Sequence, residues 1–298
     1  MAQQLQKQLS AIKRVIMDSL RKDQVPFPVN KSLCSSWTQD LPHGGETVIY
    51  TSFMYQLGSL FKIYEKHLST FVNMGGSARI ASFGKLFLKP KKEELERSYS
   101  ILRNISSLLK RSGIAHGYLY DDEPYSGGLL LELGMMDEFR EYGKTVLELF
   151  RKNGVKRVIT VDPHTTNAMS RLKDFFASDI EVVNYLTLVN GAKGGGQYVF
   201  HDPCLYTRYQ NMGEKIRDFL QDSSVVLRED RMVTSREYGT CCGGPLGTVN
   251  LDLSDRIAAD RASKLLSVSE NVLVACPLCY QNLSPHVKNL RDIAEVIS

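Results

Sequence analysis

Five of the six cysteines lie in the last third of this 298-residue chain, at a spacing suited to metal binding. One stands alone, a Cys-Cys-Gly group follows, and the last pair has the form Cys-Pro-Leu-Cys. Thiolates are ligands of soft metals and of iron–sulfur clusters. A tetrahedral zinc site closes at four ligands, and an ordinary cubane cluster also needs only four. The pattern therefore predicts a cluster with more sulfur ligands than usual, held by Cys204, Cys241, Cys242, Cys276 and Cys279.

Three motifs carry a family resemblance: His201-Asp202-Pro203-Cys204, Cys241-Cys242-Gly243-Gly244 and Cys276-Pro277-Leu278-Cys279. Together they resemble one full copy of the cysteine-rich CCG domain, which is typical of the B subunit of heterodisulfide reductase. The resemblance implies one noncubane 4Fe-4S cluster on the five cysteines, one of them bridging, in an oxidoreductase subunit for disulfide or thiol redox chemistry or electron transfer. It also implies a ferredoxin-like iron–sulfur subunit and a flavin subunit as partners, and activity only within that complex.

Two other functions stay open. Similar domains occur in electron-transfer subunits of flavin-dependent glycerol-3-phosphate, glycolate and lactate dehydrogenases, although this chain has no ferredoxin-like Cys-x-x-Cys-x-x-Cys motif. A non-redox scaffold could use four of the cysteines for structural zinc. The sixth cysteine, Cys34, is far from the others in sequence, and we expect it to be structural.

Composition excludes several classes of protein. Hydrophobic residues make up 43% of the chain and the net charge is +4, as in an ordinary globular protein. No apolar run approaches the roughly 18 residues of a membrane span, and residues 1–9 lack the apolar core of a signal peptide. We therefore expect a cytoplasmic protein with no transmembrane segment. No nucleic-acid module is recognisable, and basic clusters such as residues 89–92 are predicted to be solvated surface or a partner contact.

Alternating strand and helix patterns predict an α/β fold with mainly parallel sheets. Residues 1–22 form an amphipathic pattern, with an apolar stripe that either packs on the main body or docks a partner: Leu5, Leu9, Ile12, Ile16 and Leu20. Strands are predicted at 47–53, 158–161, 181–186, 198–201, 224–227 and 272–275, and further helices at 93–110, 135–152, 208–221, 253–266 and 281–296.

The chain also has an internal repeat of landmarks. The segments 51–55, 123–128 and 159–165 can be laid in order on 201–205, 239–244 and 273–279. We predict a duplicated CCG fold in two tandem halves: an N-terminal helix and linker at 1–45, a degenerate first half at 46–190, and a cluster-binding second half at 197–298. The cysteine positions of the first half are replaced by Met54, Tyr125, Ser126, Asp162 and Thr165, so that half should hold no cluster.

The missing cluster has two consequences. A mechanism that splits a disulfide between two facing clusters cannot run within one chain, so a second B-type subunit would have to supply the other cluster. The vacated positions must also be filled or used. They either form a packed plug or, with His164 and Asp162, line a pocket that faces the remaining cysteines. In the second half, His201 and Asp202 are expected either to hydrogen-bond near the cluster or to close the strand and cap the next helix.

Overall fold

Two parallel β-sheets form the framework of the protein, and each lies in one of the predicted halves. The computed structural model describes residues 2–73, 90–234 and 236–298. The first sheet has the strand order β1-β2-β3 and consists of Thr47–Tyr50, Arg157–Thr160 and Glu181–Asn184. The second has the order β5-β4-β6-β7 and consists of Gln197–Phe200 (β4), Val226–Leu227 (β5), Asn271–Val274 (β6) and Asn289–Asp292 (β7). Every pairing between these strands is parallel, which confirms the predicted α/β class.

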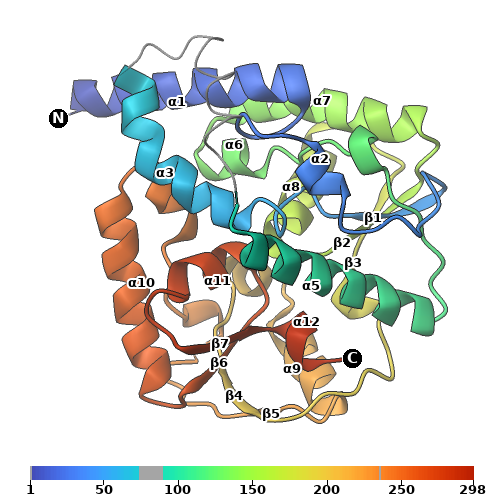
Figure 1. Cartoon of the computed structure of the whole chain (residues 1–298), viewed down its shortest axis with the longest axis vertical. Helices are drawn as coiled ribbons and strands as arrows, with labels where there is room; N and C mark the ends of the chain where they lie inside the picture. The colour runs from blue at the N-terminus through green and yellow to red at the C-terminus, as the bar shows by residue number, and fades with distance from the viewer. Residues whose placement is uncertain (1, 74–89, 235) are drawn as a thin grey trace.

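Helices cover both sheets (Figure 1). The helices that precede the second sheet are α1 (Ala2–Asp23), α2 (Ser32–Ser35), α3 (Gly58–Asn73), α5 (Lys92–Arg111), α6 (Gly128–Glu132), α7 (Met136–Lys152) and α8 (Pro163–Phe175). Those of the second half are α9 (Gly213–Asp222), α10 (Leu251–Leu266), α11 (Pro277–Leu283) and α12 (Ile293–Val296). A π-helical turn at Leu205–Tyr209 and short 3₁₀ turns, among them Gly244–Thr248, connect them.

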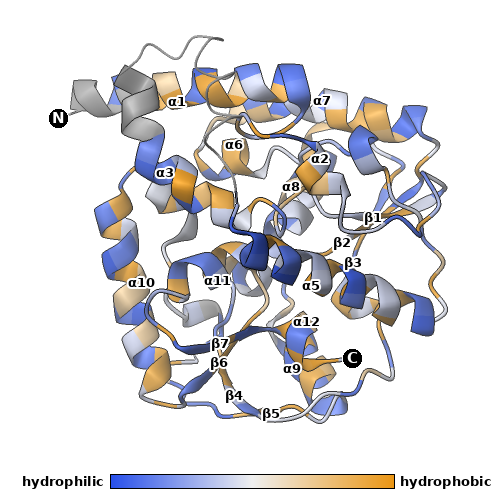
Figure 2. Cartoon of the chain, in the orientation of Figure 1, coloured by the Kyte–Doolittle hydropathy of each residue, from blue (hydrophilic) through white to orange (hydrophobic). Residues whose placement is uncertain are grey.

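The N-terminal helix α1 is present as predicted, and its apolar stripe is covered by this chain. Ile12, Ile16 and Leu20 are buried in the core, and α1 contacts α3 and α7. Figure 2 shows apolar and polar residues alternating along this helix. The side chain of Leu5 lies outside the described residues, as does Lys89 of the basic cluster at 89–92. The described part of the stripe therefore packs on the main body.

Two of the predicted helices differ from the structure. The helix predicted at 281–296 is wrong, because α11 ends at Leu283 and the chain continues as β7 and α12. Pro285 explains the break, since proline has no N–H for a helical bond and restricts the residue before it. The helix predicted at 208–221 begins only at Gly213, because the π-helical turn and Asn211, with a φ of 51°, come first.

The two sheets share an order of elements. In the first, β1 and β2 lie side by side and β3 follows; in the second, β4, β6 and β7 repeat this arrangement, with β5 added at the edge. Strand β2 leads into a helix capped by Asp162, and strand β6 leads into a helix capped by Cys276. A duplication would leave such a pattern, and the duplication and its boundaries stay predictions.

Candidate metal centre

All five predicted cysteines come together at one small, partly open cavity, which measures about 20 Å³. Cys204 follows β4, and Cys276 and Cys279 follow β6, the strand that pairs with β4. Because the carboxyl ends of neighbouring parallel strands meet at one edge of a sheet, these thiols converge although they are distant in sequence. The loop with Cys241 and Cys242 completes the group, and the Sγ atoms of Cys242 and Cys279 are 3.2 Å apart.

Backbone N–H groups point at the cysteine sulfurs. Cys276 is the N-cap of α11, and its Sγ accepts a hydrogen bond of 3.4 Å from the N–H of Cys279. Pro277 occupies the first helical turn, where a missing N–H costs nothing. The N–H of Gly243 lies 3.3 Å from the Sγ of Cys241. Such donors stabilise thiolates, which are the ligand form of cysteine.

The loop that carries Cys241 and Cys242 is fixed by side chains of the two helices behind it. Asn282 donates to the carbonyl of Cys242 at 2.9 Å, and Ser254 donates to the carbonyl of Gly243 at 2.8 Å. Gly243 has a φ of 84°, and a Cβ atom there would lie 2.7 Å from the Ser254 carbonyl oxygen. This close approach requires glycine, so the contact with Ser254 explains why a glycine follows the two cysteines in the Cys-Cys-Gly motif.

The five thiols differ in exposure. Cys242, Cys276 and Cys279 are buried, whereas Cys204 and Cys241 are partly exposed. Cys204 and Cys241 therefore mark the side of the cavity that is open to solvent or to a partner. Cys34 does not line the cavity; it is buried in the core of the first half, where its carbonyl accepts from Gln56 and Tyr118.

The thiols lie so close together that hydrogen bonds between them shift their pKa values in opposite directions. A hydrogen bond with Cys241, together with burial, raises the pKa of Cys204, and the same hydrogen bond lowers the pKa of Cys241. Burial opposes ionisation of Cys276, but hydrogen bonding from Cys279 and the nearby His164 lower its pKa to about 5. The cavity thus favours thiolates at some positions even among sulfurs alone, as ligand binding requires.

His201 contributes a buried N–H donor beside the sulfurs. One of its ring nitrogens lies within 4.8 Å of the Sγ atoms of Cys242 and Cys279. Its Nδ1 accepts a hydrogen bond of 3.1 Å from the Nε of Arg261, which can only donate. Burial lowers the pKa of His201 to about 3, so the ring is neutral and carries its single hydrogen on Nε2. A protonated Nε2 has no lone pair for a metal, so His201 is suited to donate a hydrogen bond rather than to coordinate.

Two of these donor atoms have no partner among the described residues: Nε2 of His201 and Nη2 of Arg261. Both side chains are buried, and a buried donor without an acceptor costs about 1–3 kcal/mol. Asp202, the neighbour of His201, instead forms a buried ion pair with Arg217 at 2.8 Å. His201 therefore has a donor available to the cysteines. The prediction that Asp202 caps the next helix is wrong, because Cys204 is the N-cap residue of the π-helical turn and Asp202 pairs with Arg217 instead.

The positions of the first half that the predicted repeat lays on the cysteines are packed. Met54, Tyr125, Ser126, Asp162 and Thr165 are all buried. Asp162 accepts hydrogen bonds from the N–H groups of His164 and Thr165 and from the Thr165 hydroxyl. The Ser52 hydroxyl donates to the Ser126 hydroxyl at 2.8 Å. His164, next to these positions, is also buried, and its side chain reaches the cysteine cavity, where its Nε2 lies 3.3 Å from the Sγ of Cys276.

Glu123 is a buried carboxylate that the sequence did not single out. It accepts hydrogen bonds of 2.6 Å from the N–H groups of Thr51 and Ser52. Ser52 and Phe53 both have a positive φ, so the carboxylate holds a strained turn just before Met54, the residue that the predicted repeat lays on Cys204. Burial raises the pKa of Glu123 to about 7.

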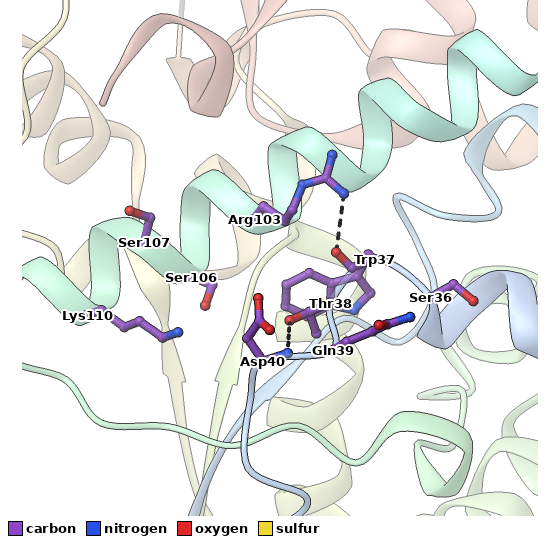
Figure 3. A pocket seen from close by; sticks show the side chains of 9 residues that line it. All are labelled: Ser36, Trp37, Thr38, Gln39, Asp40, Arg103, Ser106, Ser107 and Lys110. Atoms are coloured by element: carbon purple, nitrogen blue, oxygen red, sulfur yellow. Dashed lines mark hydrogen bonds between the residues drawn. The ribbon is translucent and has the colours of Figure 1, made fainter.

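A larger cavity of about 470 Å³ lies on the surface between residues 36–40 and α5 (Figure 3). Its wall on the α5 side includes Arg103, Ser106 and Lys110, and Arg103 donates to the carbonyl of Trp37 at 3.4 Å. None of the predicted site residues lines it. The cysteines therefore meet at the small cavity and not at this larger one.

One family of known domains matches part of the chain. Residues 198–284 match the CCG family of cysteine-rich domains. The matched segment contains all five clustered cysteines, together with His201 and Arg261. His164 and Glu123 lie outside it. No helix in the described part of the chain is long and apolar enough to span a membrane.

Two curated relatives are similar to the chain. One is named a probable iron-sulfur-binding oxidoreductase FadF, from Bacillus subtilis, and is 30% identical over 205 residues. The other is named an EtfAB:quinone oxidoreductase, from Syntrophomonas wolfei, and is 27% identical over 218 residues. Each alignment covers 64% of this chain but only 29% and 30% of the respective relative. The chain therefore corresponds to under a third of either relative.

Proposed function

We propose that this chain is an iron–sulfur redox subunit that holds one noncubane 4Fe-4S cluster on Cys204, Cys241, Cys242, Cys276 and Cys279. The observation that carries the proposal is the convergence of all five thiols on one small cavity. Five thiolates exceed what a structural zinc site uses. The name of one relative, a probable iron-sulfur-binding oxidoreductase, supports the same class of cofactor.

The surroundings of the thiols suit an anionic, sulfur-rich group. The buried Nε2–H of His201 and the Nη2 of Arg261 have no acceptor among the described residues, and a sulfide or thiolate beside them would provide one. The N–H groups of Gly243 and Cys279 already point at sulfur. Because hydrogen bonds to the sulfurs help to set cluster potentials, these donors would favour the more reduced state. The cavity would have to widen as the thiols move outward onto iron.

When bound, the cluster would supply one-electron chemistry. The chain's own residues would hold it, exclude water through the buried cysteines, and leave one side approachable at Cys204 and Cys241. A partner that delivers or removes electrons would face that side. We propose that the partners are a ferredoxin-like iron–sulfur subunit and a flavin subunit of one complex.

Two reactions could use such a subunit. The first is disulfide or thiol redox chemistry of the heterodisulfide reductase type, for which a second B-type subunit would supply the other cluster, because the packed first half has no thiols at the matching positions. The second is electron transfer alone, as in flavin-dependent dehydrogenases. The name of the second relative, an EtfAB:quinone oxidoreductase, favours this second candidate.

Anaerobic purification with iron and zinc analysis tests the proposal. We expect about four iron atoms per chain and a paramagnetic signal in one redox state. Replacing any of the five clustered cysteines with serine should lower the iron content, and Cys34→Ser is the matched control that should not. Stoichiometric zinc without iron would overturn the proposal in favour of a scaffold. Turnover of the purified complex with a disulfide or with a quinone then separates the two reactions.

A further inference from the structure

A buried chain of three side chains joins the first half to the cysteine cavity. The Nδ1 of His164 lies 2.5 Å from Oε1 of Glu132, and its Nε2 lies 3.3 Å from the Sγ of Cys276. The side chains of His164 and Glu132 are only 7% and 10% exposed. Because β2, α6 and α8 all precede residue 190, the first half supplies part of the wall of the candidate metal centre.

The backbone around His164 fixes where its ring points. Asp162 is the N-cap of α8, Pro163 occupies the first turn, and the N–H of His164 donates to Asp162 at 2.9 Å. Glu132 is the last residue of α6, which contacts α8. Both ring nitrogens are therefore committed, one to the carboxyl group and the other to the sulfur.

The available hydrogens decide which atom donates in the hydrogen bond between His164 and Cys276. A thiolate bound to iron has no hydrogen to donate, so the hydrogen between Nε2 and Sγ must belong to His164. The other nitrogen then either donates to an ionised Glu132 or accepts from a protonated one. In both arrangements the pair is neutral overall and places an N–H on the sulfur. Donors to a cysteine sulfur stabilise the reduced, more negative state of a cluster.

We propose that His164, oriented by Glu132, is a positioning residue that hydrogen-bonds to the sulfur of Cys276 and raises the reduction potential of the cluster. This inference rests on the proposed function, because it needs a cluster on Cys276. It assigns a role to the half of the chain that has lost its own cysteines. Asp162, one of the packed residues of the first half, caps the helix that carries His164. The packed residues therefore also help to hold this histidine against the cysteine cavity.

The test compares midpoint potentials in the full-length, anaerobically purified protein. His164→Ala should shift the potential to a more negative value at unchanged iron content. His164→Gln keeps an N–H donor and should restore part of the shift, and Glu132→Ala should shift it in the same direction by less. His286→Ala is the matched control, because that histidine pairs with Asp255 at 3.0 Å instead of with a cysteine.

A second readout reports the contact itself. In protein with isotope-labelled histidine, pulsed EPR should detect a nitrogen coupling from His164 that disappears in His164→Gln, while a coupling from His201 remains in both proteins. Should the iron content and the potential of His164→Ala, His164→Gln and Glu132→Ala all equal those of the parent protein, the inference is wrong while the proposed function stands. Absence of iron from the parent protein itself would instead overturn both.

Discussion

Gly127 and Gly243 adopt the same left-handed backbone conformation, with φ angles of 81° and 84°. Each is the N-cap residue of the short helical turn that follows it. The sequence comparison had placed these two glycines opposite each other. Their shared conformation supports the predicted duplication, in which other residues stand at the cysteine positions of the first half.

Replacing Gly243 with alanine should disturb the metal centre. A positive φ costs an L-residue about 1–2 kcal/mol, and the new Cβ would meet the Ser254 carbonyl at 2.7 Å. We expect a loss of roughly 2–4 kcal/mol in the free energy of unfolding, with a lower iron content. Denaturant unfolding and iron analysis measure the two effects.

Gly134→Ala is the matched control for this change. Gly134 also has a positive φ, of 73°, but a Cβ atom there would meet nothing within 4 Å. It should cost about 1–2 kcal/mol and leave the iron content unchanged. Equal losses of stability and iron in the two variants would contradict the steric explanation for Gly243.

Tyr55→Phe should weaken the contact between the two halves. The hydroxyl of Tyr55 donates to Oδ2 of Asp292 at 3.0 Å, and both residues are buried. Removing the donor leaves a buried carboxyl oxygen without this partner, which costs about 1–3 kcal/mol. Urea denaturation checks the loss. Tyr238→Phe is the control, because Tyr238 is 81% exposed and its change should stay within about 0.5 kcal/mol.

Glu123 should make the protein less stable as the pH rises. Its pKa is raised from 4.5 to about 7 by burial, so between these values the folded state binds more protons than the unfolded state. Stability contributed by the protonated form is full below about pH 4.5 and declines as the pH rises through 7. The change amounts to about 3 kcal/mol.

Thermal unfolding of Glu123→Gln tests this sign. The amide does not titrate, and its oxygen can still accept from Thr51 and Ser52. From pH 5 to pH 8, the melting temperature of the variant should fall less than that of the parent protein. A steeper fall in the variant would refute the assignment.

Removing iron should lower the melting temperature. A cluster bound only by the folded chain stabilises it, because the unfolded chain does not hold the five thiols together. We expect chelation under reducing conditions to lower the melting temperature by roughly 5 °C or more. Cys242→Ser should begin at the lower value and not respond to the chelator. An equal response in that variant would mean that the chelator acts elsewhere.

Sequence patterns predicted the α/β class and most strands to within a few residues, because buried strands are short, apolar and β-branched. The convergence of the cysteines was also predictable from the strand pattern. Each cysteine follows a strand or precedes a helical turn, and the carboxyl ends of parallel strands meet at one edge of the sheet. The helix predicted at 281–296 failed where Pro285 overrides the helical periodicity. Glu123 and the Glu132–His164 pair could not be foreseen, because their partners are brought together only by tertiary packing. His164 was singled out from its neighbours, but its contact with Cys276 spans 112 positions of sequence.

The tyrosines that cross between the halves do so in both directions. Tyr55 reaches from the first half to Asp292 at the end of β7, and Tyr206 accepts a hydrogen bond of 2.7 Å from Asn184 at the end of β3. Each half thus supplies a tyrosine that hydrogen-bonds to the last residue of a strand in the other half. The cysteine-rich segment should therefore not keep its structure when it is moved to another protein. A fusion protein that carried residues 197–298 alone would lack the hydrogen bond from Tyr55 to Asp292, and its Cys276 would face water where His164 now lies.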